Sequence, residues 1–169
     1  SSLIDQSVDE FLFHMGYNKK DANCSNYVNT NPVSDSLLGI RYLLSGEKAA
    51  VLENAGSFSS NINDQIYIYK NNYALPAAYP VKIIRQEMHW SDNPFMNQEA
   101  MLAYGTGAQA SIWKELTATK TSPSGWNINV SGDGPVYAFL AGNHAERELW
   151  VNDSYIENYY GSFYQNIIY

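Results

Sequence analysis

Cysteine, basic residues and long apolar runs are scarce in this chain of 169 residues. A single cysteine, Cys24, excludes an internal disulfide and a cage of thiolates around a metal. Only 10 Lys and Arg stand against 17 Asp and Glu, and a net charge of −7 argues against nucleic acid as a partner. The same charge predicts repulsion from an anionic membrane surface. No apolar run approaches the roughly 20 residues of a membrane-spanning helix.

Tyrosine is the most used aromatic residue, with 14 copies beside 4 Trp, while charged residues make up only 16% of the chain. This composition is typical of β-strands with solvent-exposed aromatic side chains, as in β-sandwich domains and carbohydrate-binding proteins. The length is sufficient for one domain with a core of its own. We therefore expect residues 1–169 to form a single domain.

Two segments have the pattern of a helix. At residues 5–15 the apolar side chains recur at helical spacing, Ser2 and Asp5 are both able to cap the first turn, and Gly16 follows the last turn. Asn93 and Pro94 form a typical helix start, which predicts a second helix at residues 94–104. One further helical turn is expected at residues 34–38, with Gly39 ending it. Before this turn, residues 19–32 are polar and aperiodic and predict a loop.

Short strand-like segments separated by turn residues dominate the remainder. Strands are expected at residues 40–45, 57–62, 65–70, 81–88, 110–116, 126–130, 136–140, 147–151, 155–158 and 163–168. The strand at residues 40–45 is expected to be buried. Successive antiparallel strands of this kind predict an α+β fold that is mainly β, an antiparallel β-sandwich or jelly roll with two or three peripheral helices.

Residues for catalysis or metal binding do not form a recognisable motif. His14, His89 and His144 are far apart in sequence, and none belongs to a pair with the spacing of metal ligands. Cys24 has no histidine near it in sequence that would activate its thiol. The carboxylates available to a hydrolase are Glu53, Glu87, Asp92 and Glu99. We assign no catalytic residue, no metal site and no cofactor.

The polar loop before residue 94 is the strongest candidate for a binding site. His89, Trp90 and Asp92 place an imidazole, an indole and a carboxylate in this loop, a combination suited to a sugar. The other tryptophans lie in predicted strands and are expected to pack in the core or across strands. The candidate substrate-binding residues are Trp90, His89, Asp92, Asn93, Asn97 and Gln98. For Asn97 and Gln98 we favour a structural role, in which a buried amide satisfies the backbone of the segment between Pro76 and Pro80.

Three segments resemble those of a known family. They are DSLLGIRYLLS at residues 35–45, DQIYIYKNNYALPAAYP at residues 64–80 and NPFMNQEAML at residues 93–102. In this order they resemble the LLG-(I/V)-(K/R)-Y, Y-x-N-x-x-ALP and NPFxNQ segments of the YfhO family of bacterial polytopic membrane proteins. The segment at residues 132–153 is similar to the closing strands of that family, with Asn152-Asp153 where Asn-Gly is usual. The resemblance covers nearly the whole chain.

The resemblance implies a function that the residues alone do not. YfhO proteins resemble GT-C glycosyltransferases, which transfer a sugar from an undecaprenyl-phosphate carrier to a polymer such as lipoteichoic acid outside the membrane. The chain is then expected to be an extracytoplasmic domain of a larger protein in the cell membrane of a Gram-positive bacterium. It would be accessory or acceptor-binding rather than catalytic. Its expected partners are the glycopolymer or the lipid-linked sugar, and the transmembrane region of the parent protein.

Two other functions stay open from the residues. A free-standing carbohydrate-binding β-sandwich would expose several tryptophans in a row. A small secreted glycoside hydrolase would place two carboxylates about 5 to 9 Å apart in a cleft. The chain begins with SSLIDQ, without a signal segment, and ends with the apolar NIIY, so we expect it to be part of a longer protein.

Overall fold

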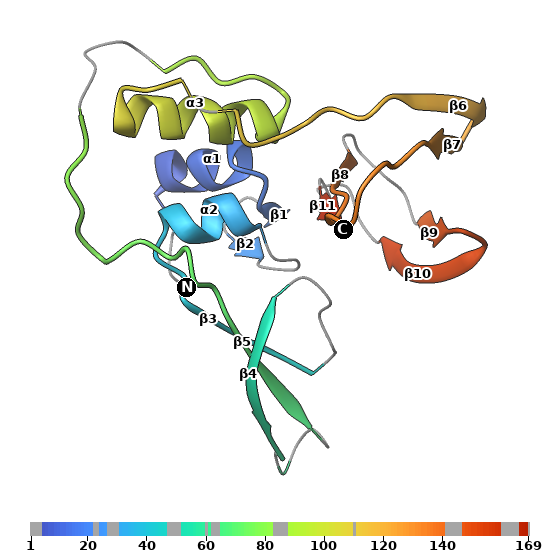
Figure 1. The fold of residues 1–169 in the computed structure, drawn as a ribbon, viewed down its shortest axis with the longest axis horizontal. Helices are drawn as coiled ribbons and strands as arrows, with labels where there is room; N and C mark the ends of the chain where they lie inside the picture. The colour runs from blue at the N-terminus through green and yellow to red at the C-terminus, as the bar shows by residue number, and fades with distance from the viewer. Residues whose placement is uncertain are drawn as a thin grey trace. The chain divides into compact units, whose positions relative to one another are not determined.

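The computed structural model describes residues 5–21, 24–26, 31–46, 52–59, 61, 65–82, 88–109, 111–140, 147–159 and 166–168. In these ranges the fold is α+β with more strand than helix, and the strand pairs are antiparallel, as the sequence predicts. The strands form sheets of two or three strands. The chain divides into two compact units (Figure 1). The first unit is Ser1–Asn26 with Lys82–Tyr169, and the second unit is Tyr27–Val81.

The two predicted helices lie side by side in the first unit. α1 spans Gln6–His14 and α3 spans Pro94–Thr106, both within two residues of the predicted bounds. Of the two caps suggested for the first helix, Asp5 is the N-cap of α1, and Asn93 is the N-cap of α3 as predicted, since each side chain accepts a hydrogen bond there. Local cap chemistry therefore determines where each helix begins.

The prediction of a loop at residues 19–32 is wrong for residues 19–21 and 24–26, which lie in strands. β1 (Asn18–Asp21) and β2 (Cys24–Asn26) form an antiparallel pair beside α1. Both strands are short and polar, so no apolar alternation marks them in the sequence.

The other strands of the first unit form three pairs. These are β6 (Ala118–Ser122) with β7 (Gly125–Ile128), β8 (Ala138–Leu140) with β11 (Asn166–Ile168), and β9 (Arg147–Val151) with β10 (Ser154–Tyr159). The predicted strands at 126–130, 136–140, 147–151 and 155–158 are confirmed with small shifts of their ends. The strand predicted at 163–168 is confirmed at residues 166–168, and its first part lies outside the described residues. β6 was not predicted, because its sequence ATKTS has no apolar period.

Two predicted strands of the first unit, at residues 110–116 and 81–88, do not appear as strands in the described residues. Residues 111–116 are outside any strand, because the Glu99 carboxylate binds the backbone N–H groups of Ile112 and Trp113. The strand expected at residues 81–88 falls largely on residues 83–87, which lie outside the described residues. Its ends, at residues 81–82 and 88, belong to no strand.

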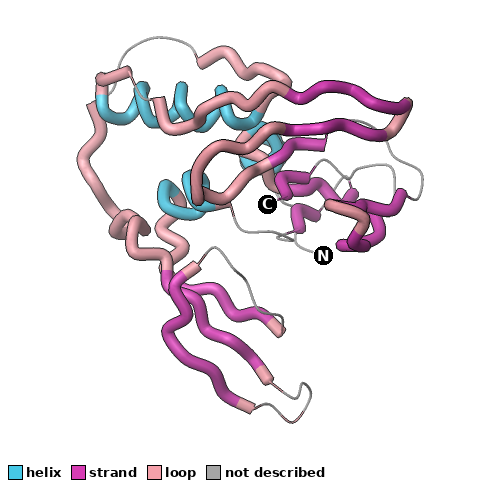
Figure 2. Tube along the Cα trace, turned by 45° about the vertical axis from the view of Figure 1, so that its right-hand side comes forward, coloured by secondary structure: helices cyan, strands magenta, loops and turns pink. Residues whose placement is uncertain are grey.

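The second unit contains one short helix and a three-stranded sheet (Figure 2). α2 spans Pro32–Leu37 and is capped by Asn31, so it begins earlier than the predicted turn at residues 34–38. The sheet has the order β3-β5-β4, with β3 at Tyr42–Ser45, β4 at Glu53–Phe58 and β5 at Ile66–Lys70. The expectation of a buried strand at residues 40–45 is wrong. Tyr42 and Leu44 are more than half exposed, since they lie on the open face of the sheet.

Buried positions are mostly polar. Among the described residues, the buried hydrophobic side chains are Met15, Tyr17 and Tyr69. The buried polar side chains are Asp9, Asn31, Ser34, Asp35, Asn97 and Gln98. Stability therefore depends strongly on hydrogen bonds that compensate for the burial of these groups.

Candidate functional site

Asn97 and Gln98 connect α3 to the end of α1. The Asn97 side-chain amide donates to the His14 carbonyl at 2.8 Å, and the Gln98 amide donates to the Met15 carbonyl at 3.0 Å. These carbonyls belong to the last turn of α1, where the helix leaves such groups without a partner. Asn97 and Gln98 are 2% and 0% exposed, so both amides serve the interior of the first unit.

Asn97 also holds the loop that precedes α3. Its side-chain oxygen accepts from the Ser91 backbone N–H at 2.9 Å, and its amide donates to the Ser91 carbonyl at 2.9 Å. The Ser91 hydroxyl donates to the Asn93 carbonyl at 3.0 Å, while the Asn93 side chain accepts from the Phe95 backbone N–H at 3.0 Å. Residues 91–97 are thus fixed by side-chain hydrogen bonds.

Trp90 is held between aromatic side chains of α1. Its ring is parallel to the His14 imidazole, with an interplanar angle of 2° and a centroid distance of 5.0 Å. Phe11 meets it edge-on at 5.9 Å. Trp90 is therefore half-buried, whereas the neighbouring His89 and Asp92 are exposed. His14 therefore helps to hold Trp90 in place.

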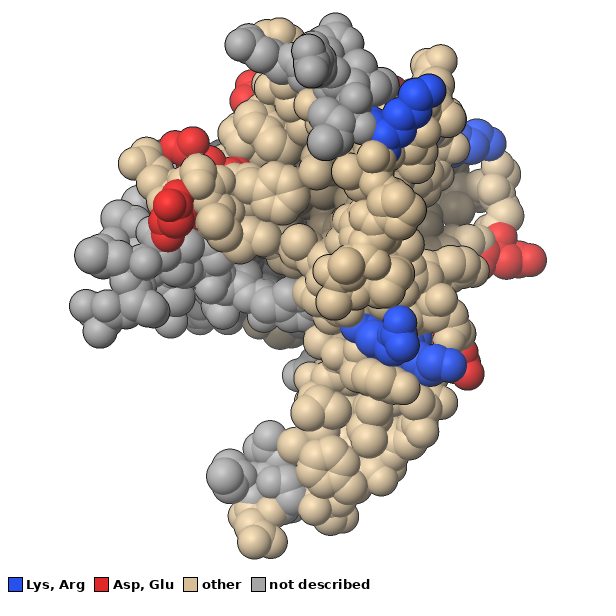
Figure 3. Space-filling view, turned by 90° about the vertical axis from the view of Figure 1, so that its left-hand side faces the viewer, with Lys and Arg blue, Asp and Glu red and all other residues tan. Residues whose placement is uncertain are grey.

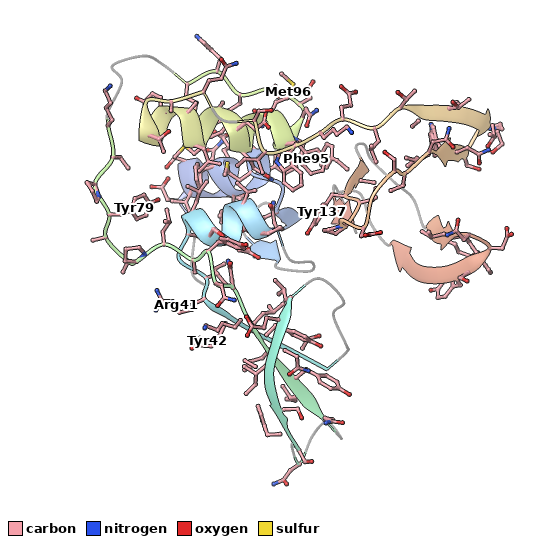
Figure 4. All side chains as sticks on the ribbon, viewed as in Figure 1. Arg41, Tyr42, Tyr79, Phe95, Met96 and Tyr137 are labelled. Carbon is pink, nitrogen blue, oxygen red and sulfur yellow. The ribbon has the colours of Figure 1, made fainter. Side chains whose placement is uncertain are left out.

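The aromatic cluster around Trp113 fixes the other end of the Gln98 amide. The Trp113 indole N–H donates to the Gln98 side-chain oxygen at 3.1 Å. Its ring lies 4.8 Å from that of Phe95 and 5.2 Å from that of Tyr137, and Figure 4 shows Phe95 and Tyr137 pointing into this region. Glu99 accepts from the backbone N–H groups of Ile112 and Trp113 at 2.6 and 2.9 Å. Trp113 packs among other aromatics, as the sequence predicts.

The candidate residues thus fall into two groups. Asn97 and Gln98 are buried and bonded to the backbone of α1, to Ser91 or to Trp113, whereas Asn93 is exposed and caps α3 through the Phe95 N–H. Three residues of the loop stay available for a ligand, with His89 and Asp92 exposed and one part of Trp90 accessible. Sequence reasoning missed Ser91, and its position two residues before an Asn-Pro helix start was the only local signal.

The expected partner of Asn97 and Gln98 is wrong. The segment at residues 74–76 takes its hydrogen bonds from within the second unit, where the Leu75 N–H donates to the Ser36 carbonyl at 2.9 Å. The Asn71 side-chain amide donates to the Ile40 carbonyl at 3.2 Å. The Tyr79 hydroxyl donates to the Leu37 carbonyl at 3.0 Å. The LLGIRY and NNYALP segments are therefore joined to each other, because the Pro-rich chain finds its partners at the end of α2.

Trp126 and Trp150 are exposed, although both have cross-strand partners. Their exposed fractions are 52% and 56%. Lys120, opposite Trp126, lies with its ammonium 5.8 Å from the indole. Tyr155, opposite Trp150, meets its ring edge-on at 5.6 Å. The prediction of cross-strand packing is confirmed for these two residues.

No group of three or more His, Cys, Asp or Glu is placed to hold a metal ion within the described ranges. The described carboxylates suggested for a hydrolase also differ in their surroundings. Glu99 binds two backbone N–H groups, Glu53 accepts from the Asn72 amide, and Asp92 is exposed. Glu87 lies outside the described residues.

Comparison with known proteins gives one match. A family model described as bacterial membrane protein YfhO matches residues 1–167. No curated protein and no solved structure matches the chain. The helices in the described part of the chain are all too short or too polar to cross a bilayer.

Proposed function

Because the chain belongs to the YfhO family of bacterial membrane proteins, we propose that it is an extracytoplasmic domain of a GT-C-like glycosyltransferase. The parent protein would transfer a sugar from a lipid carrier to lipoteichoic acid or a related cell-surface glycopolymer. The match over residues 1–167 is the observation that carries this proposal. The domain has an accessory role and binds the acceptor.

An accessory role is supported by the hydrogen bonds that polar side chains of the first unit make within the protein. Glu99 and Asn97 each bind two or more backbone groups, and the Gln98 amide has a partner at both ends. A general acid or base must instead be able to reach the substrate. These residues build the first unit and do not act on a substrate.

The acceptor site is the loop at residues 89–92. Trp90 offers an aromatic ring held in place by His14, and His89 and Asp92 offer polar groups for sugar hydroxyls. The Ser91–Asn97 hydrogen bonds fix the backbone between them, so little ordering is needed on binding. Because the chain has a net charge of −7, it repels the phosphate groups of the polymer, and we expect the contacts to be made with the sugar residues.

The function is tested in cells that carry the full-length protein. We expect His89→Ala with Asp92→Ala to reduce the sugar content of the polymer while the amount of protein in the membrane stays unchanged. Asp133→Ala, which removes an exposed carboxylate from a turn of the first unit, is the matched control. Equal sugar content in all three strains would contradict an acceptor site in this loop.

The location is tested separately. In a Cys24→Ser background, Tyr73→Cys places the chain's one thiol at a side chain that is 83% exposed. A maleimide that does not cross membranes should label this thiol in intact cells. Labelling only after the cells are opened would place the domain on the cytoplasmic side.

A free-standing carbohydrate-binding module is the second candidate, because Trp126 and Trp150 are exposed. An open reading frame without membrane spans would favour this module over the membrane protein. Glycan binding that is lost on Trp126→Ala or Trp150→Ala, and kept on His89→Ala, would favour it as well.

A further inference from the structure

The sheet of the second unit has one strongly apolar face. Residues opposite each other on neighbouring strands share a face, and every second residue along a strand does so too. Tyr42 is opposite Lys70, Leu44 is opposite Ile68, and Phe58 is opposite Ile66. We call this side the Leu44 face. Its large apolar side chains are Tyr42, Leu44, Phe58, Ile66 and Ile68.

The apolar side chains of the Leu44 face are open to solvent. Tyr42, Leu44 and Phe58 are 57%, 60% and 47% exposed. The opposite face carries Tyr69, which is 2% exposed. Leu43 and Tyr67 share that face with Tyr69, so both faces of the sheet carry apolar or aromatic side chains and the Leu44 face is the more exposed one. In a half-buried sheet the exposed face is usually polar. A contiguous exposed apolar face of this kind marks an interaction surface.

Charge is unevenly distributed along the chain. Residues 27–81 contain three of the 10 basic residues and four of the 17 acidic residues. One of those four, Asp35, is buried and accepts from the Asn31 backbone N–H. The sequence of the second unit is therefore nearly neutral in net charge, and the excess of negative charge belongs to the first unit.

Basic and aromatic residues lie at one end of the Leu44 face. Lys70 lies on the face between Tyr42 and Glu53, which are opposite it on the two neighbouring strands, and Arg41 precedes Tyr42 at the start of β3. The two basic side chains therefore outnumber the one carboxylate at this end. Figure 4 shows Arg41 and Tyr42 next to each other, and Figure 3 shows uncharged surface over the sheet with basic side chains and an acidic one at one end. Tyrosine, lysine and arginine around an apolar surface are the residues that prefer the interface of a bilayer.

We infer that the Leu44 face docks on the surface of a lipid bilayer. A protein of a membrane family is held beside the bilayer, so even a weak contact is populated. Tyr42, Leu44 and Phe58 enter the boundary between headgroups and acyl chains, while Lys70 and Arg41 contact anionic headgroups. This inference rests on family membership and not on the glycan-binding role.

The test uses the 169-residue chain tethered through a terminal His tag to vesicles of phosphatidylglycerol and phosphatidylethanolamine with a nickel-chelating lipid. An environment-sensitive dye is attached at Leu44→Cys in a Cys24→Ser background. The control carries the dye at Ile112→Cys, because Ile112 is 50% exposed and belongs to the first unit. Lipids with brominated acyl chains should quench the dye at position 44 several times more strongly than at position 112.

A second pair of variants separates docking from an effect of the dye. Phe58→Ser should weaken the quenching at position 44, whereas Val130→Ser, at a residue that is 52% exposed in the first unit, should leave it unchanged. Equal quenching at positions 44 and 112, or none at either, would overturn the inference. So would a dye response without vesicles that grows with protein concentration, because a second copy would then cover the face.

Discussion

Gln98 has no exposed surface, and both ends of its amide are bonded. It donates to the Met15 carbonyl and accepts from the Trp113 indole. Gln98→Ala leaves both of these groups without a partner, so we expect a loss of about 1 to 3 kcal/mol in the free energy of unfolding. Urea unfolding measures the loss. Gln6→Ala, which removes an exposed glutamine from α1, should change the stability by less than about 0.5 kcal/mol.

Asp5 makes the start of α1 sensitive to pH. The Ser7 hydroxyl and the Ser7 backbone N–H both donate to its carboxylate, and they lower the pKa of Asp5 below the ordinary 3.8. Because its pKa is lower in the folded state, the ionised Asp5 carboxylate stabilises the fold at pH values above its unfolded-state pKa. This stabilisation is lost as the pH falls through the folded-state pKa.

Ser7→Ala should therefore raise the pKa of Asp5 toward 3.8, because the hydroxyl is the largest cause of the shift. Titration of the Asp5 carboxyl by NMR measures it. Asp5→Asn keeps a side-chain acceptor for the helix and should lose the acid-dependent part of the stability. An unchanged Asp5 pKa in Ser7→Ala would show that the hydroxyl does not act on it.

Gly39 ends α2 in a conformation that favours glycine. Its φ is +71°, and a Cβ at this position would lie 3.1 Å from the Leu75 carbonyl oxygen. Gly39→Ala should thus cost about 1 to 2 kcal/mol, since a side chain here is strained and presses on the ALP segment. Gly46→Ala is the control, because nothing lies within 4 Å of that Cβ. Equal melting temperatures for the two variants would contradict this role.

The turn between β9 and β10 has two residues in the left-handed region. Asn152 and Asp153 have φ values of 50° and 61°. A two-residue hairpin turn of this kind favours Asn-Gly, so Asp153→Gly should stabilise the chain by about 0.5 kcal/mol. Asp133→Gly, at a residue outside the left-handed region, should bring no gain. A lower melting temperature for Asp153→Gly would show that its carboxylate has another role.

The elements that the sequence predicts best are those with local causes. Asn93-Pro94 sets the start of α3 and Asp5 that of α1, because caps act within one turn. The strands around Asn152-Asp153 were found for the same reason. β6 and the pair of β1 and β2 escaped prediction because their partners, and not their own side chains, make them strands.

Predictions that depend on distant contacts were less successful. Residues 111–116 have a strand-like sequence, yet Glu99 takes the backbone N–H groups of Ile112 and Trp113. The apolar sequence of β3 predicted a buried strand, but Tyr42 and Leu44 lie on the open face of the sheet. For the candidate site, the sequence indicated a polar loop, in which His89 and Asp92 are exposed. It did not indicate the partners that Asn97 and Gln98 have in α1, because those carbonyls lie 83 residues away.

At the scale of the whole molecule, two hydrogen-bond networks hold the family segments. One joins Asn97 and Gln98 to α1, Ser91 and Trp113 in the first unit. The other joins the NNYALP segment and Tyr79 to the end of α2 and to the two residues that precede β3 in the second unit. The segments that define the resemblance are therefore explained by two local frameworks, each built around buried polar groups.

Because the two networks share no residue, we expect their energies to add. The double variant Gly39→Ala with Gln98→Ala should lose the sum of the two single losses to within about 0.5 kcal/mol in urea unfolding. Asn97→Ala with Gln98→Ala is the contrasting pair, since both side chains bind the last turn of α1 and should couple by about 0.5 to 3 kcal/mol. A coupling above about 1 kcal/mol between Gly39 and Gln98 would instead show that the ALP and NPF segments support each other directly.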